Sequence, residues 1–209
     1  MVTVLLFAIV IGPALIPFVL AGIVMFSLKE LSAPAGEVIK IAAGKTLDLK
    51  SQGTTTLPTG SVLQVIEGTP YTAFATASVT IPRDDTIPQK TEGTEYVTVA
   101  ITPTSSSSKL HITASSGQTS SGAAAFITMA LFQDSTANAL ASSYAYHSAA
   151  NWPRDATLKY EMTSGTTSQT TFRLRIGPST STASVNGNSS ARQMGGTTAV
   201  RLTVMEIQG

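Results

Sequence analysis

TLKYEMT, residues 157–163, is the stretch that decides the fold class. Leu158, Tyr160 and Met162 alternate in it with Lys159 and Glu161. Successive side chains of a strand point to opposite faces of a sheet, so a period of two is typical of a strand with one buried and one solvated face. We therefore expect Leu158, Tyr160 and Met162 to face a core.

The same alternation recurs along most of the chain. It predicts strands at residues 61–68, 71–81, 96–102, 109–114, 123–133, 157–163, 172–176 and 200–204. No amphipathic helix of useful length separates them, so the predicted fold class is mainly β: an antiparallel β-sandwich, jelly-roll-like, that follows one N-terminal hydrophobic helix. The predicted core consists of Val97, Val99, Ile101, Leu110, Ile112, Phe126, Leu131, Leu158, Tyr160, Phe172, Leu174, Ile176, Leu202 and Val204.

Composition narrows the classes of protein that fit. The chain has 209 residues, a net charge of +1, 12% charged residues and no cysteine. A charge this close to zero gives no electrostatic case for binding nucleic acid. Without cysteine, disulfides and thiolate metal sites are excluded, so stability must come from core burial or from oligomerisation.

Residues 2–26 differ in kind from the rest, because they are apolar and carry no charge. As a helix they would be about 37 Å long, enough to cross a bilayer core. A membrane helix is the favoured interpretation; a signal peptide cleaved near residues 33–35 and a protein-buried helix are the alternatives. A kink is expected near the two prolines. The predicted anchor residues are Val2, Leu5, Phe7, Ile11, Pro13, Pro17, Phe18, Ile23 and Phe26.

Breaks in composition divide the chain into three predicted parts. Residues 1–30 form the hydrophobic or transmembrane helix. Residues 31–59 form a linker and a small β stalk module, in which Pro, Gly and Thr flank two short apolar runs. Residues 60–209 form the β-sandwich head.

Candidate catalytic and metal-binding residues do not gather into a recognisable pattern. His111 alternates out of its strand and is expected at the surface, while Asp84 and Asp85 have the setting of a solvated turn. The histidines and carboxylates lack metal-ligand spacing, and no nucleophile elbow occurs. The sequence predicts no catalytic residue, no metal, no cofactor and no enzyme activity.

The most distinctive segment is YAYHSAANWPRD, residues 144–155, which holds the only Trp of the chain. We interpret it as a loop. Aromatic side chains with polar tips suit contacts to proteins or sugars, but the favoured interpretation is that Trp152 and Tyr146 plug the end of the sandwich or the trimer axis. The candidate receptor or subunit contacts are Tyr144, Tyr146, His147, Trp152 and Arg154.

Four pieces of the chain resemble the β-sandwich heads at the C-termini of bacteriophage tail fibres and virion spikes. They are GSVLQVIEG (60–68), ITPTSSSSKL (101–110), ALFQD (130–134) and the closing set FRLR (172–175), VNG (185–187) and LTVMEI (202–207). The resemblance implies a trimeric, non-enzymatic head for host attachment or the virion surface. The membrane-type helix departs from the pattern of tail fibres.

These observations together predict a membrane-anchored viral structural protein, a spike or minor capsid protein located in the virion on an internal membrane or at the particle surface. The alternatives are a tailed-phage fibre or baseplate component with a bundled N-terminal helix, and a cellular envelope adhesin. The expected partners are two further copies in a homotrimer, other virion proteins and membrane lipid through residues 2–26, with a host surface receptor or glycan as an optional further partner.

Overall fold

Antiparallel strands make up almost all regular structure in the computed structural model, which describes residues 57–188 and 191–209. One helical turn occurs among these residues, η1 (Met194–Gly196). The strands are β1 (Val62–Glu67), β2 (Ala75–Ala77), β3 (Thr94–Ile101), β4 (Lys109–Ser115), β5 (Thr119–Ser121), β6 (Ala125–Gln133), β7 (Ala141–His147), β8 (Thr157–Thr163), β9 (Thr170–Pro178), β10 (Ala183–Val185), β11 (Gly187–Asn188), β12 (Ala191–Arg192) and β13 (Arg201–Ile207).

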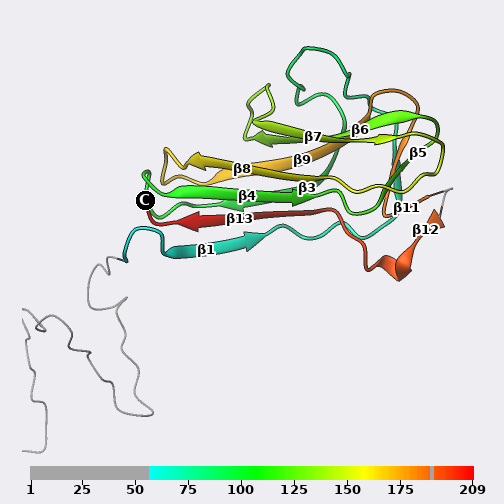
Figure 1. Cartoon of the computed structure of the whole chain (residues 1–209). Coiled ribbons are helices and arrows are strands. Elements are labelled where there is room, and N and C mark those ends of the chain that lie inside the picture. Colours follow the sequence, from blue (N-terminus) through cyan, green and yellow to red (C-terminus); the bar gives the residue numbers. More distant parts are fainter. Residues whose placement is uncertain (1–56, 189–190) are drawn as a thin grey trace, which may run out of the picture. The chain divides into compact units, whose positions relative to one another are not determined.

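Two four-stranded sheets contain all the long strands. Their orders are β1-β13-β4-β8 and β3-β9-β6-β7, and every pair in them is antiparallel. The short strands form a sheet of order β2-β10-β5 and the pair β11-β12. Figure 1 shows the long strands running along the domain, with β11 and β12 at one end and the C-terminus at the other.

The two large sheets share one hydrophobic core. Val97, Leu174 and Leu131 enter it from one sheet, and Leu202 and Ile112 enter it from the other. Every residue of the predicted core is buried except Phe126 and Tyr160, which are only partly buried. The period-two patterns therefore identified the inward faces correctly. The prediction for Phe126 was wrong because this residue lies on the outer face of its sheet.

Strand β6 is buried on both faces, as its continuous apolar run predicts. Inward-facing Leu131 joins the core, whereas Phe132 and Ala130 lie on the outer face beneath residues 78–93, which we call the covering loop. Ile81 of this loop packs on them, and its N–H donates to the Pro178 carbonyl at 3.0 Å. The covering loop thus shields Ala130 and Phe132 on this outer face, whereas outward residues of β3 and β7 stay exposed.

Arg175 of β9 secures the covering loop. Its Nε donates to the Glu92 carbonyl and its Nη2 to the Gly93 carbonyl, each at 2.8 Å, and its Nη1 lies 3.3 Å from a Glu95 carboxylate oxygen. The left-handed φ of +63° at Gly93 permits this turn, and a Cβ there would lie 2.8 Å from Ile81 Cδ1. Two kinds of contact therefore hold the covering loop on the sheet: the apolar packing of Ile81 and the hydrogen bonds donated by Arg175.

The outer face of the β1-β13-β4-β8 sheet is exposed in the described residues, and we call it the bare face. Cross-strand pairing aligns its side chains in rows. One row consists of Val65, Met205, His111 and Glu161, and the next consists of Glu67, Thr203, Thr113 and Lys159. Val65 is 55% exposed although it lies within a strand.

The predicted strands differ from the structure in two longer stretches, and the short strands β5, β10, β11 and β12 were not predicted. Residues 71–81 were predicted as one strand but contain only the three-residue β2 and an isolated bridge at Tyr71. Residues 141–147, not predicted as a strand, form β7. The predicted N-terminal helix with all of its anchor residues, and most of the stalk module, lie outside the described residues.

Candidate functional site

An aromatic cluster on the outer face of β6 and β7 is the most exposed apolar feature near the predicted site. Phe126 pairs with Tyr146 across the strands, with ring centroids 4.8 Å apart, and Tyr144 meets Phe126 edge-on at 5.5 Å. The Arg83 guanidinium of the covering loop lies 3.9 Å from the centroid of the Phe126 ring. Tyr144 is 62% exposed and Tyr146 49% exposed, so the cluster faces solvent.

Tyr144 and Tyr146 belong to strand β7, and the prediction of a loop there was wrong. The strand is hard to recognise because its amphipathic pattern is inverted. Ala145 and Ser143 point toward the core side, while the two large tyrosines point outward. The period-two rule recognises a strand by large apolar residues on its buried face, so it does not recognise a strand whose large residues face water.

His147 ends β7 and is fully buried, so its placement in a loop was also wrong. Its Nδ1 donates to the Trp152 carbonyl at 2.7 Å, and its Nε2 lies 3.3 Å from the Thr119 hydroxyl. Burial lowers the pKa of His147, the hydrogen bond to Trp152 raises it, and the Arg154 charge lowers it further, with a lowered pKa as the net result. The His147 imidazole thus ties the end of β7 to the turn that contains Trp152.

The remaining predicted contacts lie apart from the tyrosines. The Trp152 side chain is 52% exposed, so it does not plug the sandwich within one chain, and neither does Tyr146. Arg154 lines a different hollow of about 380 Å³ with Gln118 and Asp155. The structure therefore brings Tyr144 and Tyr146 together and separates them from Arg154. A receptor, glycan or subunit contact at any of these residues stays a prediction.

Sequence reasoning missed Arg83 and misplaced Phe126. Nothing in the local sequence indicates that Arg83 reaches the ring of Phe126 in β6. Phe126 could have been assigned outward from parity: it precedes Ile127 in β6, and Ile127 faces the core. The register of β6 with β7, which no local pattern reveals, completes the cluster.

A buried carboxylate links β1 and β13 to the segment between β3 and β4. Glu206 of β13 is fully buried and accepts hydrogen bonds from Gln64 Nε2 at 2.5 Å, from the Thr104 amide at 2.8 Å and from the Thr104 hydroxyl at 2.7 Å. Burial raises the pKa of Glu206, but the donated hydrogen bonds outweigh it and lower the pKa. We call Glu206, Gln64 and Thr104 the Glu206 frame, because one carboxylate joins three segments that are distant in the sequence.

Other titratable groups occupy ordinary surface positions. His111 lies on the bare face, as predicted, with its Nε2 3.0 Å from a Glu161 carboxylate oxygen. Asp84 accepts hydrogen bonds from the Thr86 hydroxyl and the Thr86 amide, which lower its pKa. This is the solvated turn that the sequence predicted. Within residues 57–188 and 191–209, no three His, Cys, Asp or Glu residues come together as metal ligands.

The fold and site define a class: an antiparallel β domain with two large sheets, a buried polar frame, and open hollows on its surface. A family model described as the Pgp3 C-terminal domain matches residues 80–209. The chain therefore belongs to this family, which is one of chlamydial virulence-related proteins. No curated protein matches the chain.

The family membership corrects the prediction of a viral structural protein. The resemblance to bacteriophage tail-fibre and virion-spike heads was wrong, and so were the virion location and the proposed roles built on it, including the phage-fibre and envelope-adhesin alternatives. Three of the resembling stretches, 60–68, 101–110 and 202–207, contain the residues of the Glu206 frame. In the part of the chain that the structure describes, no helix is long and apolar enough to span a bilayer.

Proposed function

We propose that residues 60–209 form a jelly-roll-like β-sandwich that acts by binding rather than by catalysis, and that the protein works as a homotrimer whose subunits meet on the bare face. The aromatic cluster on the opposite sheet is then left outward for another partner. The 55% exposure of Val65 on the outer face of the edge strand β1 is the observation that carries the proposal.

The order of the strands supports the jelly-roll-like description. The chain changes between the two large sheets at every step from β1 through β3, β4, β6, β8 and β9 to β13, and stays in one sheet only from β6 to β7. Two Greek keys folded together give sheets in which early and late strands lie side by side, as β1 lies beside β13 and β3 beside β9.

The chemistry of the bare face favours a second copy of this chain as its occupant. Val65 and Met205 form an apolar pair near one edge strand. Around them lie charges of both signs, with the Arg201 Nη1 2.7 Å from a Glu67 carboxylate oxygen and Lys159 in the neighbouring row. A face with mixed charges around an apolar pair can complement another copy of the same molecule.

The buried titratable groups support a role other than catalysis. Glu206 and His147 are the groups that lie deepest, and each is enclosed by partners within the fold. Neither lines any of the described surface hollows. A general acid or base must reach a substrate atom at hydrogen-bond distance, which these two side chains do not do without opening the domain.

Light scattering of the full-length protein after gel filtration tests the proposal. We expect a mass three times that of the chain. The substitution Val65→Glu should lower the mass or weaken the assembly on dilution, because it buries a charge in the contact. Val79→Glu is the matched control, because Val79 is 46% exposed on the covering loop. A monomeric wild type, or equal behaviour of both variants, would contradict the proposal.

A further inference from the structure

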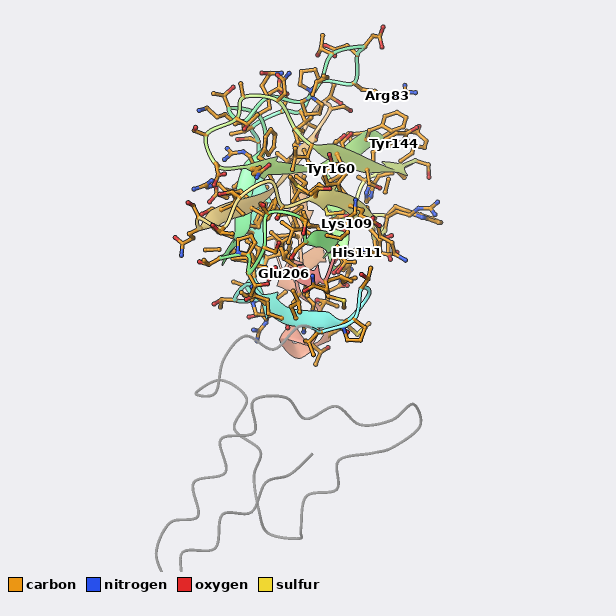
Figure 2. All side chains as sticks on the ribbon, turned by 90° about the vertical axis from the view of Figure 1, so that its left-hand side faces the viewer. Arg83, Lys109, His111, Tyr144, Tyr160 and Glu206 are labelled. Atoms are coloured by element: carbon orange, nitrogen blue, oxygen red, sulfur yellow. The ribbon has the colours of Figure 1, made fainter. Side chains whose placement is uncertain are left out.

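The inverted pattern of β7 is unusual because it places aromatic surface in water where a smaller residue would suffice. Tyr144 and Tyr146 bury little area within the domain, so core packing does not account for them. Exposed aromatic residues that gather at one place commonly mark a contact with a ligand or partner. Figure 2 shows Tyr144 near Arg83, on a part of the domain away from His111 and Glu206.

A hollow of about 360 Å³ opens beside Tyr146. Arg83, Phe126 and Tyr146 line it together with Ser179 and Thr180. Its volume is at the lower end of the range for small-molecule sites and fits one or two sugar rings. Tyr144, two residues before Tyr146, does not line the hollow.

Arg83 provides a cation that the fold leaves available. Among the described residues, its side chain donates no hydrogen bond and forms no ion pair, in contrast to Arg173, Arg175 and Arg201. Its contact is with the Phe126 ring, which holds the guanidinium beside the hollow by a cation–π interaction. A planar guanidinium in this position can bind a carboxylate through two parallel hydrogen bonds.

Ser179 supplies a hydroxyl whose proton is free. Its Oγ accepts the Phe126 N–H at 3.1 Å, and its own N–H donates to the Phe126 carbonyl at 2.8 Å. These two bonds fix the serine at the floor of the hollow. The hydroxyl hydrogen then remains to donate to a ligand oxygen, and the exposed Thr180 hydroxyl lies next to it.

We propose that this hollow binds a pyranose sugar that carries a carboxylate. The apolar face of the ring packs on Tyr146, the carboxylate pairs with Arg83, and sugar hydroxyls bond to Ser179 and Thr180. A protein partner is less suited to the hollow itself, because a stable protein interface needs about 800 Å² from each side and this site offers one cation and one ring wall. The inference concerns the sheet opposite the bare face and does not depend on the proposed trimer.

Saturation-transfer NMR on the full-length protein tests the inference with three probes: 3′-sialyllactose, a disaccharide of glucuronic acid, and lactose. We expect transfer to the ring protons of one or both acidic sugars and little to lactose. Arg83→Gln should weaken binding about tenfold or more through loss of the charged hydrogen bonds, and Tyr146→Ser should weaken it similarly. Arg83→Lys should be intermediate, because it keeps the charge and loses the fork.

Trp152→Ser is the matched control, since Trp152 is 52% exposed, close to the 49% of Tyr146, and does not line the hollow. It should leave sugar binding unchanged. A tetraglutamate peptide is added as an acidic ligand without a sugar ring. The inference is overturned if lactose binds as well as the acidic sugars, if none of the three sugars binds, if Trp152→Ser weakens binding as much as Tyr146→Ser, or if the peptide binds as well as the acidic sugars. Each variant is compared by thermal melting, so that loss of folding is recognised.

Discussion

The two large sheets of this domain have the same size and the same antiparallel pairing, yet their outer faces are treated differently. The β3-β9-β6-β7 sheet is covered from outside by residues 78–93, which bury Phe132 and are fastened by Arg175. In residues 57–188 and 191–209 no segment covers the outer face of the β1-β13-β4-β8 sheet, and Glu206 secures this sheet from the core side. The first sheet therefore carries its own cover, and we propose that the second presents its outer face to another copy of the chain.

The largest expected effect is at the covered face. Phe132→Ala should lower the free energy of unfolding by about 3–5 kcal/mol, because it removes a fully buried ring and leaves a cavity under the covering loop. Urea denaturation at two protein concentrations measures it. The loss should not depend on concentration, since the contacts of Phe132 are within the chain.

The frame inside the bare sheet should be nearly as sensitive. Glu206→Ala leaves the Thr104 amide and the Gln64 amide group without their acceptor, and should cost about 2–4 kcal/mol. Asp155→Ala is the control, because this exposed carboxylate forms no hydrogen bond or ion pair among the described residues and should change stability by less than about 1 kcal/mol. If both variants lowered the free energy of unfolding equally, the claim that the Glu206 frame stabilises the sheet more than a surface carboxylate does would be contradicted.

Met205 on the bare face is the residue to compare with Phe132, because we propose that copies of the chain bury it, whereas Phe132 is buried within one chain. Met205→Ala should cost about 1 kcal/mol, and the loss should grow with protein concentration, because the side chain gains burial only when copies associate. The same urea series as for Phe132 provides the measurement. A loss that is independent of concentration would mean that the bare face is not a contact.

The two sheets should also respond to acid in different pH windows. The pKa of His147 is lowered in the folded state from its usual 6.5, so the unfolded chain binds more protons and stability falls as the pH drops below about 6.5. The pKa of Glu206 is also lowered, from 4.5, so its contribution is present above that pH and is lost only as the pH falls further. Melting temperatures between pH 8 and 3 resolve the two steps, and His147→Gln should remove the first step alone.

Much of the fold could be predicted from the sequence because buried and exposed side chains alternate along most of the strands. Strands such as β4, β8 and β9 alternate large apolar and polar residues, and each was assigned with its correct inward face. Strand β7 could not be, because its inward residues are small and its outward residues are tyrosines. The covering loop was also missed, since its contact with Phe132 joins positions about 50 residues apart and no local pattern encodes it.

The candidate site shows the same limit more sharply. The sequence identified Tyr144 and Tyr146 as aromatic residues with polar tips, but it grouped them with Arg154, which lines another hollow. Their actual neighbours, Arg83 and Phe126, come from a distant loop and an adjacent strand. The local sequence draws attention to the two tyrosines. Which residues lie next to them in space depends on the pairing of β6 with β7 and on the covering loop, and the local sequence encodes neither.

The most direct test of the bare face is thiol labelling of the assembled protein. The chain has no cysteine, so Val65→Cys and Val79→Cys each introduce a single thiol at a comparably exposed valine. Our account predicts that a maleimide labels Val65→Cys much more slowly than Val79→Cys in the native assembly and that both label equally fast in urea. Equal labelling rates in the native protein would contradict the claim that the subunits meet on this face.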